Sequence, residues 1–301
     1  MLQRLTVSDF ESFFALMELS FPTTERRTKE DQRALFDAEA AYRVYGLQNS
    51  ATHKVEAFLA VWDLDGILFV EHFAVDPTLR GQGIGSRLLA ELAKMTDKPL
   101  CLEVEPPCTD LAIRRIAFYK RNGFFLNEFP YLQPSLAKGE PPIPLMVMTL
   151  GKALSKEEFE QVREELYRKV YHVEPMSPCE YDRFYSMKAC AEHALKALAP
   201  KENRQAIVLY TKNGNQYSAV IENALSEKGS DERALLQKLN AEADTEITDL
   251  LCLWQNGSID LPSYRFRKQL IACNKTNQNT KIFVLSSHGY QAVALKKTIL
   301  C

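Results

Sequence analysis

Residues Phe73 to Leu89 read FAVDPTLRGQGIGSRLL and decide the expected fold of the first half of the chain. The apolar start predicts the end of a strand, the glycines at 81, 83 and 85 predict a tight loop, and the leucines predict a helix over Ser86–Lys94. Glycine adopts backbone conformations barred to residues with a Cβ, so several N–H groups can converge on one anion. Because the positive end of the helix dipole lies behind the same loop, the stretch predicts a phosphate-binding site.

Two familiar phosphate loops do not fit this stretch. A Walker loop needs GxxxxGK[ST], and no lysine follows the glycines. A dinucleotide fingerprint needs GxGxxG, whereas the glycines here stand at every second position after Arg80. The pattern R-x-x-G-x-G after a V-x-P turn instead resembles the pyrophosphate loop of the GNAT superfamily, the acyl-CoA-dependent N-acyltransferases. A glycine-rich turn that serves packing alone is the alternative.

The resemblance implies acetyl-CoA as the acyl donor and assigns its binding residues. Backbone groups of the preceding strand would hold the pantetheine arm, and the loop would hold the pyrophosphate. The implied cofactor-binding residues are Phe73, Ala74, Val75, Arg80, Gly81, Gln82, Gly83, Ile84, Gly85 and Ser86.

A second block of the chain supports the same resemblance. Pro99–Glu105, PLCLEVE, predicts a short strand, and Ala112–Phe124 predicts a helix closed by Asn122-Gly123. Its ending, FYKRNGF, is similar to the superfamily's FYxxxGF motif, which implies that Tyr119 lies near the sulfur of the bound thioester. A tyrosine packed on the sheet is the structural alternative. The asparagine that usually precedes this tyrosine by seven residues is Ala112 here.

The chemistry of amine acylation explains why a tyrosine and a carboxylate are expected at such a site. An amine attacks a thioester only when neutral, so a base must take its proton, and the departing thiolate benefits from an acid. Tyr119 is the predicted acid, because a phenol with a pKa of about 10 keeps its proton at neutral pH. Glu71 is the predicted base by a narrow margin over Glu105, and Glu103 is third. A structural hydrogen bond across strands is the alternative role for each carboxylate.

The strand period places these carboxylates on faces of the predicted sheet. In the strand Leu68–Val75, period two puts Glu71 on one face with Phe73 and Val75. Glu103 and Glu105 likewise share a face of the next strand. We therefore expect both strands to present carboxylates beside the acyl donor.

Two further segments are expected to enclose the acceptor. Thr6–Leu19 predicts an amphipathic helix, the string FPTTERR follows at 21–27, and a second helix runs through Ala41. The resemblance implies that this arm roofs the acceptor pocket, where Glu25 would contact a cationic amine; a solvated charge is the alternative. Tyr131 lies in a proline-rich segment, 128–144, that is expected to be irregular and to form the other wall.

Length, composition and charge bound the remaining possibilities. The 301 residues are 46% hydrophobic and 25% charged, enough for two cores, and the net charge is −2. These values favour neither a nucleic-acid nor a membrane partner. Seven cysteines without a CxxC pair, and the lack of an apolar run of membrane length or a signal peptide, favour a cytoplasmic location. A homodimer is possible.

A second domain is expected after Val173. The prolines of the stretch 174–178 predict a linker, and alternating helices and strands after it predict an α/β layered domain over 174–301. The strings SAVIENA (218–224), SDERALL (230–236) and LPSYRFRKQL (261–270) resemble motifs of the cytidine deaminase fold. The three zinc-ligand cysteines of that family would fall on Ser230, Ser263 and Phe266, so no zinc is expected. Glu232 keeps the proton-shuttle position.

Together these observations predict an α/β protein of two domains. The first, over 1–173, would have a mixed, mostly antiparallel GNAT sheet flanked by helices. The implied function is transfer of acetyl from acetyl-CoA to a primary amine of a small molecule or peptide, by direct attack in a ternary complex. A non-catalytic CoA-binding or nucleotide-sensing protein is the alternative.

Overall fold

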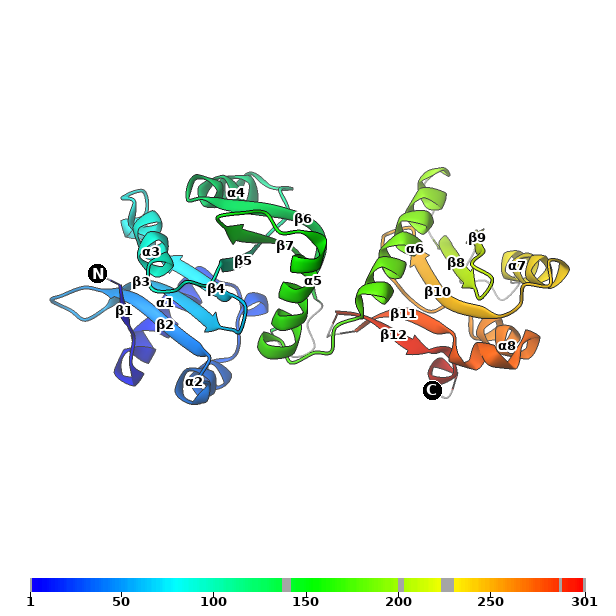
Figure 1. Ribbon diagram of the computed structural model, residues 1–301, viewed down its shortest axis with the longest axis horizontal. Coiled ribbons are helices and arrows are strands. Elements are labelled where there is room, and N and C mark those ends of the chain that lie inside the picture. Colours follow the sequence, from blue (N-terminus) through cyan, green and yellow to red (C-terminus); the bar gives the residue numbers. More distant parts are fainter. Residues whose placement is uncertain (1, 137–141, 200–202, 223–229, 287–288, 300–301) are drawn as a thin grey trace. The chain divides into compact units, whose positions relative to one another are not determined.

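A computed structural model describes residues 2–136, 142–199, 203–222, 230–286 and 289–299 (Figure 1). The chain divides into two compact units, Met1–Pro175 and Met176–Cys301. This division falls within the proline-containing stretch 174–178 and two residues beyond Val173. Each unit contains its own sheet and its own apolar core.

The first unit is built on a seven-stranded sheet in the order β1-β2-β3-β4-β5-β7-β6. Its strands are β1 (Gln3–Arg4), β2 (Tyr42–Gln48), β3 (Val55–Asp63), β4 (Leu68–Val75), β5 (Leu100–Val104), β6 (Phe124–Gln133) and β7 (Ile143–Leu150). Its helices are α1 (Phe10–Ser20), α2 (Lys29–Ala38), α3 (Ile84–Ala93), α4 (Asp110–Arg121) and α5 (Lys156–Glu165), which continues into a π-helical turn, Leu166–Val170. Neighbouring strands are antiparallel except β4 and β5, so the predicted mixed, mostly antiparallel sheet is confirmed.

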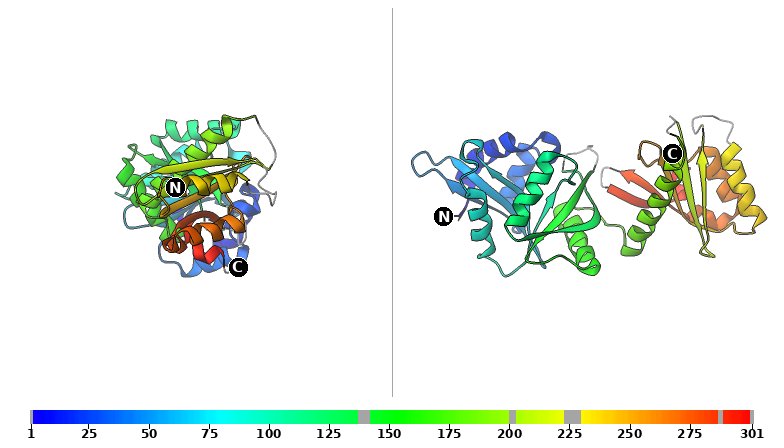
Figure 2. Two further views of the ribbon diagram at one scale, coloured as in Figure 1. Left: turned by 90° about the vertical axis from the view of Figure 1, so that its right-hand side faces the viewer. Right: turned by 90° about the horizontal axis from the view of Figure 1, so that it is seen from above.

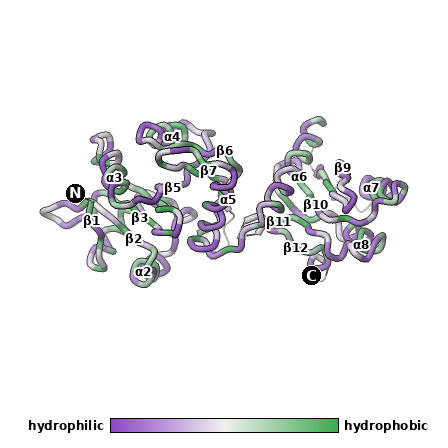
Figure 3. The backbone as a smooth tube through the Cα atoms, viewed as in Figure 1, coloured by the Kyte–Doolittle hydropathy of each residue, from purple (hydrophilic) through white to green (hydrophobic). Residues whose placement is uncertain are grey.

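Helices cover both faces of this sheet (Figures 1 and 2). Phe13 of α1 and Phe159 of α5 belong to the core on one face, and Leu88 of α3 and Ile116 of α4 belong to the core on the other. The central strand β3 contributes side chains to both cores, because successive side chains of a strand point to opposite faces of the sheet. Apolar colouring accordingly follows the strands, while the exposed turns are hydrophilic (Figure 3).

The segment 128–144, expected to be irregular, is strand at its two ends, over residues 128–133 and 143–144. β6 runs to Gln133 and β7 begins at Ile143. Its pairing shifts between Asn127 and Tyr131, which is a bulge, and β6 is an edge strand. An edge strand tolerates Pro130 because its missing N–H is not needed on the open side. The prediction from proline content was therefore wrong for the two ends of the segment, while residues 134–136 and 142 have no strand structure and 137–141 lie outside the described residues.

The second unit has a five-stranded sheet in the order β12-β11-β10-β8-β9. Its strands are β8 (Gln205–Thr211), β9 (Gln216–Ile221), β10 (Ile247–Trp254), β11 (Lys281–Ser286) and β12 (Gly289–Ala294). Its helices are α6 (Pro178–Lys196), α7 (Ser230–Ala241) and α8 (Tyr264–Cys273). One face packs against α6 and the other against α7 and α8, so this unit is also layered. The final strand, β12, was not expected.

Candidate active site

The site begins where the two parallel strands of the first unit separate. β4 and β5 pair from Leu68 with Leu100 to Val70 with Leu102. Glu71 and Glu103 are the next residues on the two strands. Both line a cavity of about 690 Å³ and a smaller one of about 110 Å³. These two carboxylates therefore lie where one cavity meets the other.

A β-bulge places Glu71. Ala60 of β3 pairs with His72, and the next residue, Val61, pairs with Val70, so Glu71 is an extra residue in β4. Phe73 packs with the α3–α4 core, whereas Ala74 belongs to the core on the other face. Because a bulge re-aims the side chain at its position, the expected regular alternation of Glu71 with Phe73 and Val75 is interrupted.

The glycine loop has the conformations that the sequence predicted. Gly81 and Gly83 have φ of +80° and +74°, and a Cβ at either would meet no atom within 4 Å, so the loop surface is open. Gly83 caps helix α3. At Gly85 the reason for glycine is different, since a Cβ there would lie 3.2 Å from the rings of both Phe73 and Phe118.

The larger cavity gathers most of the predicted cofactor residues. Those that line it are Phe73, Ala74, Val75, Arg80, Gly81, Gly83, Ile84, Gly85 and Ser86. Gln82 is exposed and does not line it. Arg114 and Arg115, which sequence reasoning missed, line the cavity from α4 and add positive charge beside the loop. Their position in the first turns of the predicted helix was the available signal.

Tyr119 lines the larger cavity from α4. Its ring packs against Phe118 and Phe124, with centroids 5.2 and 5.6 Å away. Burial raises the pKa of the hydroxyl to about 12, although the charge of Arg115 opposes this. The phenol therefore keeps its proton throughout the neutral pH range.

Glu103 accepts three hydrogen bonds. Oε1 accepts from the hydroxyl of Tyr131 at 2.5 Å, and Oε2 accepts from Gln133 Nε2 at 2.6 Å and from the hydroxyl of Tyr171 at 2.7 Å. Burial raises the pKa of Glu103 to about 7, against the lowering effect of these donors and with help from the charge of Glu71. A carboxylate has about four acceptor positions, so about one remains for a ligand.

Glu71 has the opposite electrostatic setting. Its Oε2 accepts from Arg27 Nη1 at 2.8 Å and lies 3.4 Å from Nδ1 of His72. Burial acts to raise the pKa of Glu71, but Arg27 and His72 outweigh it and lower the value to about 2. Glu71 therefore stays ionised and is a poor base, which reverses its expected order with Glu103.

The smaller cavity contains the other predicted carboxylates. Glu25 and Glu105 both line it, and Glu105 pairs with Arg115 at 2.7 Å. Burial, followed by the charge of Glu105, raises the pKa of Glu25. Tyr131 has a different place from the one expected, since it lines neither cavity and is buried against Glu103. Its neighbour Gln133 lines the smaller cavity instead.

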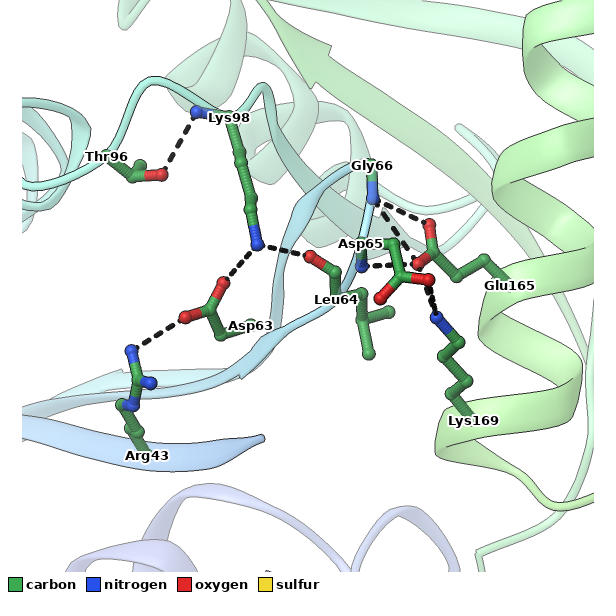
Figure 4. A network of polar contacts seen from close by, with 9 residues as sticks. All are labelled: Arg43, Asp63, Leu64, Asp65, Gly66, Thr96, Lys98, Glu165 and Lys169. Carbon is green, nitrogen blue, oxygen red and sulfur yellow. Dashed lines mark hydrogen bonds and ion pairs between the residues drawn. The ribbon is translucent and has the colours of Figure 1, made fainter. Parts of the chain in front are cut away.

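Tyr171, which donates to Glu103, directly follows the π-helical turn at the end of α5. A network of polar contacts holds α5 and this turn against the β3–β4 turn (Figure 4). Glu165 accepts from the backbone N–H of Asp65 at 2.6 Å, and Lys169 pairs with Asp65 at 2.7 Å. The signal for Tyr171 in the sequence is weak, since it is an aromatic residue four positions after Tyr167, which is helical spacing.

In the second unit the candidate carboxylate, that of Glu232, makes structural hydrogen bonds. Glu232 is buried and accepts from Ser263, at 3.1 Å from the backbone N–H and 2.6 Å from the hydroxyl. Ser263 caps helix α8, and Phe266 is fully buried. The side chain of Ser230 lies outside the described residues. In the described part of the chain, no group of three or more potential metal ligands occurs.

The geometry of the first unit agrees with three comparisons. The acetyltransferase (GNAT) domain family matches residues 41–125. A protein of Bacillus subtilis (strain 168), named "putative acetyltransferase YjbC", is 29% identical over 154 residues, which are 50% of this chain and 77% of that protein. The solved structure of a GNAT-family protein from Bacteroides thetaiotaomicron is 34% identical, covers 58% of this chain and 99% of its own, and gives a TM-score of 0.54.

The second unit has a weaker comparison. Cytidine deaminase from Mycobacterium leprae is 21% identical and covers 38% of this chain and 96% of its own, with a TM-score of 0.30. That score does not assign the second unit to a family, and the deaminase-like fold stays a prediction. No helix in the described residues is long and apolar enough to cross a membrane.

Proposed function

The chain belongs to the GNAT family of acetyltransferases. We propose that it acetylates a primary amine of a small molecule or peptide. In this proposal Glu103 is the base and Tyr119 is the acid. The observation that carries this proposal is the junction of the two cavities, where carboxylates from β4 and β5 line both. A donor in the larger cavity and an amine in the smaller one would meet there.

The larger cavity fits acetyl-CoA. Its glycine loop leaves open space where a Cβ would otherwise stand, and Arg80, Arg114 and Arg115 line it with positive charge suited to phosphates. The volume of about 690 Å³ is within the usual range for ligand sites. When bound, acetyl-CoA supplies an activated acetyl thioester.

The two titratable groups have complementary roles in this proposal. Glu103 takes the proton of the attacking amine through its remaining acceptor position, directly or through a water molecule. Tyr119 gives a proton to the sulfur as the C–S bond breaks and the new C–N bond forms. The products are an N-acetyl amine and the free thiol of CoA, and water exchange returns the enzyme's protons.

Glu103 is a better candidate than the other two carboxylates. A base works best when its pKa lies near the operating pH, and the pKa of Glu103 is about 7, whereas that of Glu71 is about 2. Glu105 is ion-paired with Arg115 and roughly two-fifths exposed. Direct attack fits because Cys101, close in sequence, is fully buried, and burial raises the pKa of its thiol well above the usual value.

A thiol-release assay tests the function. The full-length protein is incubated with acetyl-CoA and a panel of primary amines, and free CoA thiol and the acetylated product are measured. We expect thiol release with one class of amine and an equal amount of product. Acetyl-CoA binding without product for any amine would favour the alternative, a non-catalytic CoA-binding or nucleotide-sensing protein.

A further inference from the structure

We infer that the acceptor is a short α,ω-diamine, whose inner nitrogen lies at Glu71 and Glu103 and whose outer ammonium pairs with Glu25. This inference deepens the proposed function and rests on it. It follows from the charge, shape and unsatisfied groups of the smaller cavity.

The two cavities differ in the balance of their charged lining residues. Three guanidinium groups, from Arg80, Arg114 and Arg115, line the larger one and outnumber its two carboxylates, those of Glu71 and Glu103. Four carboxylates line the smaller one, with Arg115 as its one guanidinium among the described residues: Glu25, Glu71, Glu103 and Glu105. An anionic donor and a cationic acceptor would therefore each enter the cavity of opposite charge.

One of the residues that line the smaller cavity, Glu71, has an unsatisfied acceptor. The side chain of Glu71 is 1% exposed, and within the described structure its Oε1 has no hydrogen-bond partner. A buried carboxylate oxygen without a partner costs free energy, which an N–H donor in the cavity would recover. Because Arg27 keeps Glu71 ionised, this oxygen is suited to an ammonium or amine nitrogen.

Apolar side chains also line the smaller cavity. They are those of Phe21, Val104, Ile143 and Leu145. The cavity volume of about 110 Å³ is small compared with the usual range of about 300 to 1,000 Å³ for ligand sites. A short methylene chain fits this space, whereas a ring system with many hydroxyl groups does not.

The outer carboxylate, that of Glu25, is available for a second cation. Among the described residues no cation forms an ion pair with it: Arg26 pairs with Glu18, Arg27 pairs with Glu71, and Arg115 in the same cavity pairs with Glu105. Burial raises the pKa of Glu25, the repulsive charge of Glu105 adds to this effect, and the charge of Arg115 opposes it without cancelling it. A ligand ammonium beside Glu25 relieves this repulsion, which a monoamine of the same length cannot do.

Calorimetry on the complex with CoA tests the inference without requiring turnover. The probes are 1,4-diaminobutane and butylamine, which differ in one ammonium group. We expect the diamine to bind at least tenfold more tightly than the monoamine in the wild-type protein. In Glu25→Gln this ratio should fall to about one to threefold, because the amide has no charge for the outer ammonium.

The matched control is Glu30→Gln, which removes one negative charge from the exposed first turn of α2 in the same arm. It should keep the tenfold preference. Equal affinity for both probes, undetectable diamine binding, or an equal loss of preference in the control would overturn the inference.

The thiol-release assay separates the two claims. Tight diamine binding that depends on Glu25 but gives no acetylated product would support the inference and refute acetyl transfer to that ligand. Product formation from other amines, without diamine preference, would support the transferase and overturn the inference.

Discussion

The first unit has a partly buried carboxylate, Glu103, and the second a buried one, Glu232; the sequence indicates both as candidate functional residues, but their surroundings differ. Glu103 of the first unit accepts from three side chains, lines two cavities and has about one acceptor position left. Glu232 of the second unit binds both the backbone N–H and the hydroxyl of Ser263, at the start of α8. A buried carboxylate therefore indicates a reactive site only when it also faces a cavity and retains an acceptor position.

Glu103→Gln should produce the largest change. The amide keeps the size of the side chain but cannot take a proton, and a general base contributes about 10²- to 10⁴-fold to the rate. We expect kcat to fall by that factor with little change in acetyl-CoA affinity, measured by thiol release and calorimetry. A loss below about fivefold would place Glu103 with Glu232 as a structural carboxylate.

Arg27→Met tests how much the ion pair between Arg27 and Glu71 stabilises the fold. It leaves the buried Glu71 carboxylate without its guanidinium, and the expected loss of unfolding free energy is about 3 to 5 kcal/mol. The control is Arg43→Met, whose pair with Asp63 is partly exposed and should cost no more than about 1 kcal/mol. Urea denaturation measures both.

The pH dependence of stability sharpens this test. Since the pKa of Glu71 is lowered from 4.5 to about 2, the wild type has the full stabilisation above pH 4.5 and loses it as the pH falls toward 2. This acid-dependent loss should be much smaller in Arg27→Met. An unchanged dependence would mean that Arg27 does not set the ionisation of Glu71.

Tyr119→Phe should lower kcat by about 10²-fold, at the lower end for a general acid because a thiolate is a good leaving group. Acetyl-CoA affinity should change little, as measured by calorimetry. Tyr45→Phe is the control, because Tyr45 also packs against the α3–α4 core and lines neither cavity. Equal turnover in the two variants would remove Tyr119 as the acid.

Glu232→Ala should give the smallest effect. Loss of its bonds to Ser263 weakens the start of α8 and should lower the unfolding free energy by about 1 to 2 kcal/mol. The acetylation rate should remain that of the wild type. A rate loss of tenfold or more in a protein that remains folded would contradict a purely structural role.

The sequence predicted the features that depend on neighbouring residues. β4 has the predicted bounds, and Gly81 and Gly83 have left-handed conformations that a residue with a Cβ rarely adopts, because both features depend on local pattern and backbone freedom. The order of the carboxylates could not be predicted. It depends on a bulge at Glu71 and on partners far away in sequence, Arg27 for Glu71 and Tyr171 for Glu103.

The pH dependence of kcat/KM for acetylation, in the wild type and in Glu103→Gln, tests the central claim most directly. Only the ionised form of Glu103 can take the amine's proton, so the wild-type rate should rise with pH through a limb near 7. In the variant this limb should be absent and the residual rate should be low across the range. The same limb in both proteins would contradict Glu103 as the base.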